Sequence, residues 1–496
     1  MFFSHIFPSI ALSLGKCRQM IVGRKKEKEI LDYLMNSNQA EFVAIYGRRR
    51  VGKTFLIREY CQKNIVFDFT GSLETSTSIQ LYQFFNELNR ASDNRAANKI
   101  PENWSEAFHL LTNYLYSLEK ENKKIVVFID EVPWIDRPKS GFLSALQYFW
   151  NQHGSKMKYL VLITCGSAAS WMIQNLINAK GGLYNRITQR IELKPFNLKE
   201  TEEYFSYRNL TFTSYQMVQL YMVMGGIPFY LNAIKAGKSV HQIIDELCFE
   251  EGGLLADEFK PLYYSLFKNA ENHLDIVKEL VKHHYGMDRK QLSEKTKTPK
   301  GGTFSRTLDN LINCGFIMIV PPFGKKSKNT IYKVVDFYSI FFLKFIDGNT
   351  SSRKNVWQSL SNSAHFDALS GYAYENICLT HLNAIHHSLG ISGVYTKVNS
   401  WNFPGNEEMP GAQVDMVIER NDGIIHLCEA KFTTNEFIIS KEYAASLRQK
   451  RAIFQYVTQT KKAVVTTLLT TYPAIQNKYY KEEIHTEVSM DVFFSS

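Results

Sequence analysis

Residues 41–60 read EFVAIYGRRRVGKTFLIREY, and this stretch decides the fold of the chain. The apolar run Phe42–Tyr46 is long enough for one buried strand, and Phe55–Cys61 has the apolar spacing of a helix. The residues between them, from Gly47 to Thr54, have the spacing G-x-x-x-x-G-K-[ST]. A strand, a glycine loop and a helix in this order predict a phosphate-binding loop, with a chance glycine turn as the alternative.

The predicted loop has the chemistry that a nucleoside triphosphate requires. Gly47 and Gly52 allow the backbone to curl so that its N–H groups point at an anion, and the helix adds its positive end. Lys53 supplies a charge for the β and γ phosphates, and the hydroxyl of Thr54 can ligate Mg²⁺. The predicted nucleotide-binding residues run through the loop into the helix: Gly47, Arg48, Arg49, Arg50, Val51, Gly52, Lys53, Thr54 and Phe55.

A pair of acidic residues follows a second buried run. Residues Ile125–Ile129 are all apolar, as expected of a central strand that is covered on both faces. Asp130 and Glu131 come directly after it, at the carboxyl end, where ligands bind in such sheets. Asp130 is predicted to support the Mg²⁺, and Glu131 is predicted to orient the attacking water. A surface turn is the alternative.

Three polar residues further along are candidates for the same site. The run Tyr159–Thr164 predicts another buried strand, and Ser167 follows it either at the site or as the cap of the next helix. Arg186, or alternatively Arg190, is predicted to reach a nucleotide, its own or that of a neighbouring chain. An arginine in that place stabilises charge that develops on the phosphoryl group. A solvated arginine is the alternative for both.

The composition is that of an ordinary globular protein. The chain has 496 residues, enough for about three domains, and is 45% hydrophobic and 21% charged. Its formal charge of +10 favours polyanionic partners. Seven cysteines stand singly, which predicts reduced thiols in a cytoplasm and argues against a zinc site.

No membrane span is predicted, since no run approaches the roughly 20 apolar residues that a membrane helix needs. Residues Phe2–Leu14 are apolar, but no basic residue precedes them. We expect residues 1–19 to lie outside the fold, with Met20 as a candidate start. A signal peptide is the alternative.

The middle of the chain predicts two further helical modules. Residues 198–250 have helical spacing around Gly225–Pro228 and are expected to form a lid. Residues 271–335 give three helices and then two strands, the order of a winged helix. A DNA-binding one would present basic and hydroxyl side chains to a groove, and the lysines of the turn 323–328 to phosphates. These side chains are Lys300, Thr303, Ser305 and Arg306. A pure protein-contact module is the alternative.

The C-terminal part contains a second group of acids. After a polar linker near residues 350–363, two strands joined by a turn carry Asp415 on one and Glu429 and Lys431 on the other. Residues two apart on a strand face the same side, so these three can meet, bind Mg²⁺ and position a water for phosphodiester attack. Glu375 on the preceding helix is predicted to add another metal ligand. A surface hairpin with alternating charges is the alternative.

Residues 20–265 resemble the archaeal-type ATPase family, a branch of the AAA+/STAND P-loop proteins. The matching motifs are Val22–Arg24, Tyr46–Thr54, Phe128–Trp134, Cys165–Ser167 and Gly225–Pro228. The resemblance implies that Val22–Arg24 and the helix after it lie against adenine, with simple packing as the alternative. It also implies that Ser167 senses the γ-phosphate. The C-terminal part is similar to a PD-(D/E)XK nuclease, although Asp415 follows Val414 where many members have proline.

We therefore expect a multidomain α/β protein: a P-loop NTPase parallel sheet with a helical lid, a winged helix, and a restriction-endonuclease-like α/β domain. The expected segments are an extension 1–19, an ATPase core 20–197, a lid 198–265, a winged helix 270–345, a linker 346–362 and a nuclease-like domain 363–496. The expected activity is Mg²⁺-dependent ATP hydrolysis coupled to DNA binding or cleavage. The alternative is a signalling switch with a non-catalytic, partner-binding C-terminal domain. DNA is an expected partner, and a second copy of the chain is a candidate.

Overall fold

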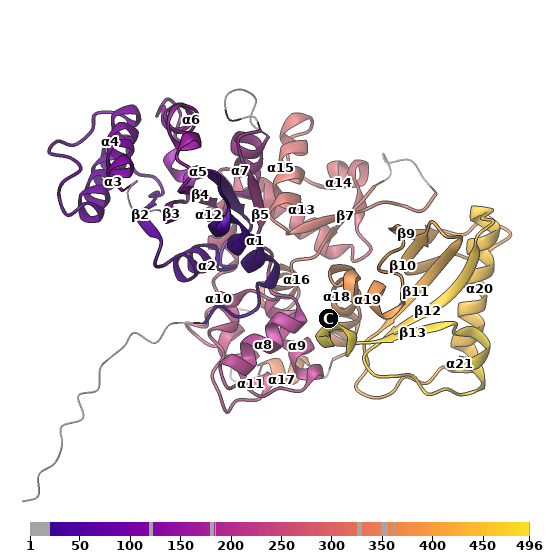
Figure 1. The fold of residues 1–496 in the computed structure, drawn as a ribbon. Helices are drawn as coiled ribbons and strands as arrows, with labels where there is room; N and C mark the ends of the chain where they lie inside the picture. Colours follow the sequence, from indigo (N-terminus) through magenta and orange to yellow (C-terminus); the bar gives the residue numbers. More distant parts are fainter. Residues whose placement is uncertain are drawn as a thin grey trace, which may run out of the picture.

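The computed structural model describes residues 20–118, 123–178, 183, 185–324, 330–348, 356–361 and 363–495. Figure 1 shows these residues as a row of modules that runs along the sequence from the indigo to the yellow end. The predicted extension 1–19, the lysines of residues 325–328 and part of the predicted linker lie outside the described residues. No described helix is long and apolar enough to cross a membrane.

The first module is built on a parallel five-stranded sheet. Its strands follow the order β2-β3-β4-β1-β5, and every neighbouring pair is parallel. They are β1 (Glu41–Tyr46), β2 (Ile65–Thr70), β3 (Ile125–Asp130), β4 (Leu160–Gly166) and β5 (Gln189–Glu192). Strand β4 lies between β1 and β3, and the three strands are parallel. The predicted phosphate loop after β1 and the predicted acid pair at the end of β3 therefore lie near each other, at the carboxyl ends of the strands.

Helices bury both faces of this sheet, which explains its uninterrupted apolar strands. Phe42 and Ala44 of β1 pack on one face with α3, α4 and α6, whereas Val43 and Ile45 pack on the other. The helices of this module are α1 (Lys25–Asn36), α2 (Lys53–Tyr60), α3 (Thr77–Ala91), α4 (Trp104–Ser117), α5 (Val132–Ile135), α6 (Phe142–Gln152) and α7 (Ala169–Met172). The alternation is that of a strand with two hydrophobic sides.

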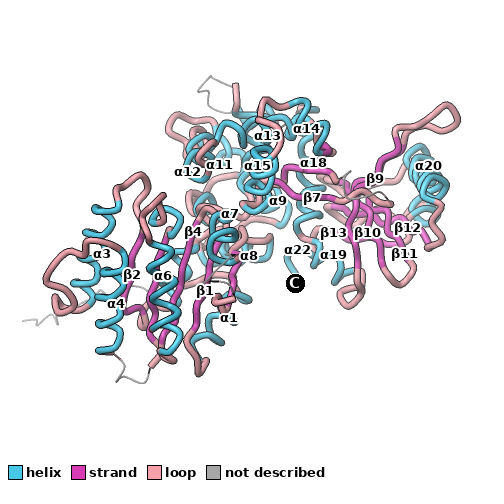
Figure 2. Tube along the Cα trace, turned by 90° about the horizontal axis from the view of Figure 1, so that it is seen from above, coloured by secondary structure: helices cyan, strands magenta, loops and turns pink. Residues whose placement is uncertain are grey.

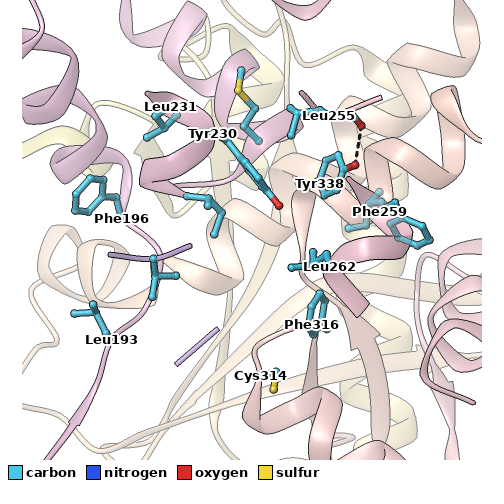
Figure 3. Packing of buried hydrophobic residues seen from close by; sticks show 14 of the residues in the cluster. Leu193, Phe196, Tyr230, Leu231, Leu255, Phe259, Leu262, Cys314, Phe316 and Tyr338 are labelled. Atoms are coloured by element: carbon cyan, nitrogen blue, oxygen red, sulfur yellow. Dashed lines mark hydrogen bonds between the residues drawn. The ribbon is translucent and has the colours of Figure 1, made fainter. Parts of the chain in front are cut away.

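A helical region follows, and its core continues into the modules on either side. It contains α8 (Leu198–Tyr207), α9 (Ser214–Met224), α10 (Pro228–Leu231), α11 (Val240–Cys248) and α12 (Phe259–Leu266). Figure 3 shows Tyr230 and Phe259 of this region in the same cluster as Leu193, next to β5, and Phe316, further along the chain. The hydroxyl of Tyr338 donates to the Leu255 carbonyl at 2.7 Å. Apolar contact is therefore continuous across the module boundaries.

Residues 270–334 contain the three predicted helices and the two predicted strands in the predicted order, with one unpredicted short strand, β6, after the first helix. They are α13 (Ala270–Lys282), β6 (Met287–Asp288), α14 (Arg289–Lys295), α15 (Gly302–Asn313), β7 (Ile317–Val320) and β8 (Ile331–Val334). The strands form an antiparallel sheet in the order β6-β8-β7. Next come α16 (Phe337–Phe341) and, within the predicted linker, α17 (Val356–Leu360). Trp357 of α17 is buried and its N–H donates to Asp245 of α11, so this part of the linker is packed on the helical region.

The last module is a mixed sheet between helices. Its strand order is β13-β12-β11-β10-β9, antiparallel from β9 to β11 and parallel from β11 to β13. The strands are β9 (Thr396–Phe403), β10 (Ala412–Arg420), β11 (Ile424–Lys431), β12 (Ala463–Thr470) and β13 (Thr486–Ser489). The helices are α18 (Ala364–Thr380), α19 (Leu382–Ser388), α20 (Lys441–Thr458), α21 (Lys478–Glu483) and α22 (Val492–Ser495). Figure 2 shows α20 on one side of the sheet and α18 and α19 on the other.

The described cysteines are free and buried, in agreement with the predicted reduced thiols. They are Cys61, Cys165, Cys248, Cys314, Cys378 and Cys428. Burial raises the pKa of each of these thiols above its ordinary value. Cys17 lies outside the described residues.

A buried histidine joins the helical region to the last module. His381, directly after α18, accepts a hydrogen bond at Nε2 from the N–H of Leu198 at 3.0 Å, and its Nδ1 lies 2.9 Å from the Ile377 carbonyl. Since Nε2 accepts, the neutral ring must carry its proton on Nδ1. Burial lowers the pKa of His381 from 6.5 to about 4.

The lowered pKa of His381 predicts that the folded chain, held together here by this histidine, loses stability in acid. Between pH 6.5 and about 4 the unfolded chain binds a proton at His381 that the folded chain does not, so stability falls as the pH falls through this window. The loss is expected to reach about 3 kcal/mol. His381→Gln should reduce the pH dependence of denaturant unfolding there, to which the buried His273 and His426 also contribute, whereas His387→Gln, at an exposed position, should leave it unchanged. Equal slopes for the wild type and His381→Gln would contradict this role.

Candidate functional site

The backbone between β1 and α2 curls as the sequence predicts. Gly47 has φ +147° and Gly52, the residue before α2, has φ +92°. A side chain at Gly47 would meet the Leu193 carbonyl oxygen at 2.2 Å, whereas a Cβ at Gly52 would have open space around it. Gly47 is therefore required by close approach as well as by its dihedral angle, and Gly52 by its dihedral angle alone.

Lys53 lies at the centre of the site with its ammonium group folded onto the loop. Its Nζ donates to the carbonyls of Gly47 at 3.0 Å and Arg48 at 2.9 Å, and to the Ser167 hydroxyl at 3.2 Å. Ser167 in turn donates from its hydroxyl and from its N–H to the two carboxylate oxygens of Glu131. Ser167, at the end of the intervening strand β4, thus links the predicted phosphate-binding lysine to the predicted water-orienting glutamate.

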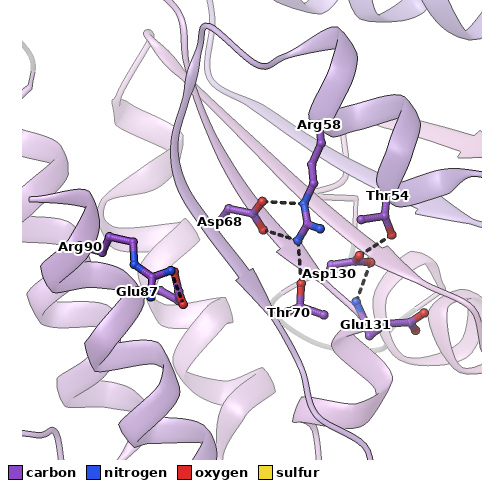
Figure 4. A network of polar contacts seen from close by, with 8 residues as sticks. All are labelled: Thr54, Arg58, Asp68, Thr70, Glu87, Arg90, Asp130 and Glu131. Atoms are coloured by element: carbon purple, nitrogen blue, oxygen red, sulfur yellow. Dashed lines mark hydrogen bonds and ion pairs between the residues drawn. The ribbon is translucent and has the colours of Figure 1, made fainter. Parts of the chain in front are cut away.

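The predicted metal ligands of the first module lie in contact. The hydroxyl of Thr54 donates to Asp130 Oδ2 at 2.5 Å, and the other oxygen of Asp130 accepts from the Glu131 N–H at 2.9 Å, as Figure 4 shows. Asp130 is buried, and Glu131 has the left-handed backbone angle φ +49°. A hydroxyl beside a buried carboxylate is an oxygen donor set that fits Mg²⁺.

An ion pair at the neighbouring strand borders this site. Arg58 of α2 binds Asp68 with two hydrogen bonds and donates to the Thr70 hydroxyl at 3.0 Å. Asp68 and Thr70 belong to β2, next to β3 in the sheet. The pair fixes the loop helix to the edge strand.

The three arginines of the loop have side-chain partners outside it. Arg48 forms a buried ion pair with Asp336 and lies over the Phe316 ring at 4.8 Å. Arg50 pairs with Glu258 at 2.6 Å, and the guanidinium of Arg49 lies 5.9 Å from the centre of the Trp134 ring. Burial is the largest single effect and lowers the pKa of Arg48, but the charge and hydrogen bond of Asp336, together with the nearby Tyr230 and Tyr263, raise it by more in sum. The pKa of Arg48 therefore lies above its ordinary value. Their predicted contact with a nucleotide can run through the loop backbone.

The other predicted nucleotide contacts are more scattered. Val51 is buried in the loop, and Phe55 on α2 is 40% exposed. Arg186 is exposed in a turn after Leu183, and Arg190 is exposed on β5. Both arginines are exposed, which leaves open the predicted contact with a nucleotide of this chain or of a neighbouring one. Those roles stay predictions.

Arg24 supports the loop from behind, which the sequence did not reveal. Its guanidinium donates to the Val51 carbonyl at 2.9 Å and to the Lys194 carbonyl at 2.6 Å, and it lies 4.5 Å above the Phe196 ring. The resemblance placed Val22–Arg24 against adenine, but this arginine is 4% exposed and directed at the backbone of the loop. The sequence shows only an arginine directly after a glycine here, and the structure gives that glycine, Gly23, a φ of +63°.

The C-terminal acids approach one another on β10, β11 and α18. Met416 pairs with Cys428 in the antiparallel ladder, so Asp415 and Glu429 are the next residues along the same two strands. Asp415 Oδ2 accepts from the Ala430 N–H at 2.9 Å. Its negative charge adds to the pKa shift of Glu375 on α18, so these two carboxylates are close enough to interact.

Lysines hold two of these acids. Glu429 receives two hydrogen bonds from Lys450 of α20, both at 2.8 Å, and Glu375 pairs with Lys333 of β8 at 3.1 Å. Burial raises the pKa of both glutamates to about 7, against the opposing charges of the lysines. Lys431 lies with its Nζ 5.0 Å from the centre of the Tyr443 ring.

In this arrangement the described residues contain no cluster of three or more histidine, cysteine or acidic side chains that could hold a metal ion. Glu375, Asp415 and Glu429 are therefore near one another without converging on one point. Their predicted role as metal ligands stays a prediction. The sequence analysis missed Lys333 and Lys450, because each pairs with an acid on another element. A local signal existed only for Lys450, which lies two helical turns after Tyr443 on one face of α20.

Comparison with known proteins identifies the first module. A family model described as an ATPase domain predominantly from Archaea matches residues 21–234. Residues 21–234 are thus similar to an archaeal-type ATPase domain. The match covers the phosphate loop, the acid pair, Ser167 and the start of the helical region. It confirms the expected P-loop ATPase and leaves the modules after it outside the match.

Two archaeal relatives extend the comparison. The chain is 25% identical over 407 residues to the uncharacterized protein MJECL04 of Methanocaldococcus jannaschii, covering 78% of this chain and 83% of that protein. It is 49% identical over 43 residues to the uncharacterized ATP-binding protein MJ0423 of the same organism, covering 9% of this chain and 73% of that protein.

Among solved structures, the Walker-type ATPase PABY2304 of Pyrococcus abyssi aligns with a TM-score of 0.47 and 17% identity. The alignment covers 65% of this chain and 96% of that one.

The two loop glycines of the ATPase domain predict unequal effects of alanine. Gly52→Ala introduces only a strained dihedral angle, expected to cost about 1–3 kcal/mol. Gly47→Ala adds a collision with the Leu193 carbonyl and should destabilise the domain by more. Denaturant unfolding of the two variants checks this order, and a Gly47→Ala variant as stable as Gly52→Ala would show that the loop can move away from β5.

Proposed function

We propose that this chain hydrolyses ATP with Mg²⁺ and uses its nucleotide state to control the C-terminal module. The observation that carries the proposal is the convergence of Lys53, Thr54, Asp130 and Glu131 through Ser167 at the ends of three adjacent strands. One cation, one hydroxyl and two carboxylates meet there, beside a helix N-terminus and a curled backbone. These are the groups that positioning and charge stabilisation in phosphoryl transfer require.

Each residue has a distinct role in this proposal. The loop N–H groups and Lys53 hold the phosphates, and Thr54 and Asp130 hold the metal, which when bound neutralises charge on the phosphoryl oxygens. Glu131 orients the attacking water once its carboxylate leaves the donors of Ser167. Ser167 contacts both Lys53 and Glu131, so its hydrogen bonds depend on whether the lysine binds a phosphate.

Substitution at the loop lysine tests the ATPase assignment. Lys53→Ala should abolish nucleotide binding and lower ATP turnover by at least about 10²-fold, since it removes the buried cation of the site. Glu131→Gln should slow turnover to a similar extent but retain binding of a fluorescent ATP analogue. Lys63→Ala, at an exposed position after α2, is the matched control. Unchanged phosphate release by Lys53→Ala would remove the assignment.

A second function is favoured by the C-terminal acids. We infer that residues 270–345 form a winged helix and that residues 363–496 form a nuclease-like module that binds or cleaves DNA. In support, Lys300 is exposed two residues before α15, and Arg306 is exposed on that helix. Asp415, Glu429 and Lys431 occupy adjacent positions on two paired strands. A homo-oligomer is part of this proposal because the exposed Arg186 could serve a neighbouring site.

A nicking assay with supercoiled DNA separates cleavage from pure binding. Wild-type protein is expected to nick DNA with ATP and Mg²⁺ or Mn²⁺, and Asp415→Asn or Lys431→Met should abolish nicking, because each removes a charged group from the strand pair. Asp422→Asn, in the turn of the same hairpin, provides the control with an intact acidic site. If the wild type cuts no DNA with either metal, the signalling switch with a partner-binding C-terminal module becomes the better proposal.

A further inference from the structure

A short segment at the end of β8 contacts both sites of the molecule. Lys333 reaches Glu375 in the last module, with the two side chains only 6% and 15% exposed. Asp336, three residues later, pairs with Arg48 of the phosphate loop, and each side chain of that pair is 4% exposed. Two buried ion pairs, one at each site, therefore belong to a single stretch of chain.

The Lys333 end of the segment is fastened to α18. The Val334 carbonyl accepts hydrogen bonds from the Tyr372 hydroxyl and from the Asn376 amide, both at 3.0 Å. The Nζ of Lys333 also lies 4.8 Å from the centre of the Tyr372 ring. The residues on α18 that hold β8 thus flank Glu375, one of the predicted metal ligands.

A cavity of about 330 Å³ opens where these modules meet. Residues of the β6–α14 region, such as Tyr285 and Asp288, line it together with Asp415 of β10. Lys333 and Glu375 also line it. Lys333 is the positive group that lines this cavity together with the carboxylates of Glu375 and Asp415. The position of Lys333 therefore determines the net charge that another cation or a phosphate would meet in the cavity.

The Asp336 end of the segment is fastened to the loop. Asp336 Oδ2 accepts from the N–H and the hydroxyl of Ser339, near the start of α16, and the N–H of Val335 donates to the Phe316 carbonyl at 3.0 Å. Phe316 is the ring over which Arg48 lies. Two buried nitrogens of Arg48, Nε and Nη2, have no hydrogen-bond partner among the described residues. The pair is enclosed but incompletely satisfied, as expected of a contact with a second arrangement.

We propose that the segment Lys333–Asp336 couples the two sites, and that nucleotide binding at the phosphate loop withdraws Lys333 from Glu375. This inference rests on the proposed ATP-binding function and adds the route by which it controls the C-terminal module. Lys333 neutralises the acidic site in the nucleotide-free chain, and its withdrawal exposes Glu375 and Asp415 to the cavity.

The direction is set by the movement that the loop must make. Lys53 donates to the carbonyls of Gly47 and Arg48, and its ammonium group must turn toward a bound phosphate. The Arg48 carbonyl then loses its donor and the loop rearranges at that residue. Separating a buried ion pair leaves an uncompensated charge, so Arg48 and Asp336 move together and displace the end of β8.

Hydrogen–deuterium exchange of the full chain tests this route directly. The probe is the non-hydrolysable analogue AMP-PNP, and its binding is measured on the same sample by calorimetry. Saturation is expected to speed exchange of the amides in residues 331–336 and in residues 372–376 of α18. In Asp336→Asn, AMP-PNP should still bind, but exchange in these peptides should no longer respond. AMP-PNP binding to the wild type with no change in either peptide would overturn the coupling alone, whereas no binding would overturn the proposed function as well.

Affinity provides an independent test that does not need the Asp336 variant to fold. Because coupling is reciprocal, Lys333→Met, which keeps the length of the side chain and removes its charge, should tighten AMP-PNP binding by roughly fivefold. The control is Lys462→Met, whose Nζ pairs with Glu419 at 2.8 Å elsewhere in the last module. It should bind AMP-PNP as the wild type does. Equal affinities for Lys333→Met and Lys462→Met would overturn the proposal.

Discussion

Parallel hydrogen bonding of β4 between β1 and β3 is the constraint on which the ATPase site depends. Residue by residue, Glu41–Tyr46 of β1 pairs with Val161–Gly166 of β4, and Ile125–Ile129 of β3 pairs with Leu160–Thr164 on the other side. All three strands therefore end level, and the residues directly after each strand meet at one edge of the sheet. A shift of register in either pair would separate Lys53 from Ser167, and Ser167 from Glu131.

The arginines of the loop add a second constraint. A phosphate loop needs only small residues and a lysine, yet this loop directs Arg48 and Arg50 to acids that come from later modules. A buried pair such as Arg48–Asp336 is weak evidence for stability, because desolvation offsets much of the attraction. It is stronger evidence for a defined relative position, since each partner alone would be an uncompensated charge. The ATPase domain is thereby held in register with the helical region and with β8.

The sequence predicted the local elements well and the contacts between modules poorly. The loop, the acid pair and the three central strands of the first sheet, β3, β4 and β1, were accessible because apolar runs and glycine spacing are local properties. The edge strands β9 and β13 were missed: residues 396–403 mix polar and apolar side chains, and Thr486–Ser489 is short. The partners of Arg48, Glu375 and Glu429 could not be predicted, because Asp336, Lys333 and Lys450 have no fixed spacing from them and meet them only through tertiary packing.

Similarly, the acidic hairpin was placed correctly while the partners of its acids were not predicted. The alternation of β11 puts Glu429 and Lys431 on one side, as expected from a period of two residues. Which cation meets Glu429 depends on α20, and the sequence of that helix alone does not reveal that Lys450 faces the sheet. Both lysine–glutamate pairs thus depend on tertiary packing, within the last module for Lys450 and between two modules for Lys333.

The inaccessible thiols have a practical consequence for following motion in this molecule. All six described cysteines are buried, and the raised pKa of each thiol leaves little of the reactive thiolate at neutral pH. With Cys17 replaced by serine, a cysteine introduced on an exposed helix face would be the group that reacts first with a maleimide dye. Distances between two such dyes, one on α2 and one on α20, could then be recorded in single molecules while the native interior stays unlabelled.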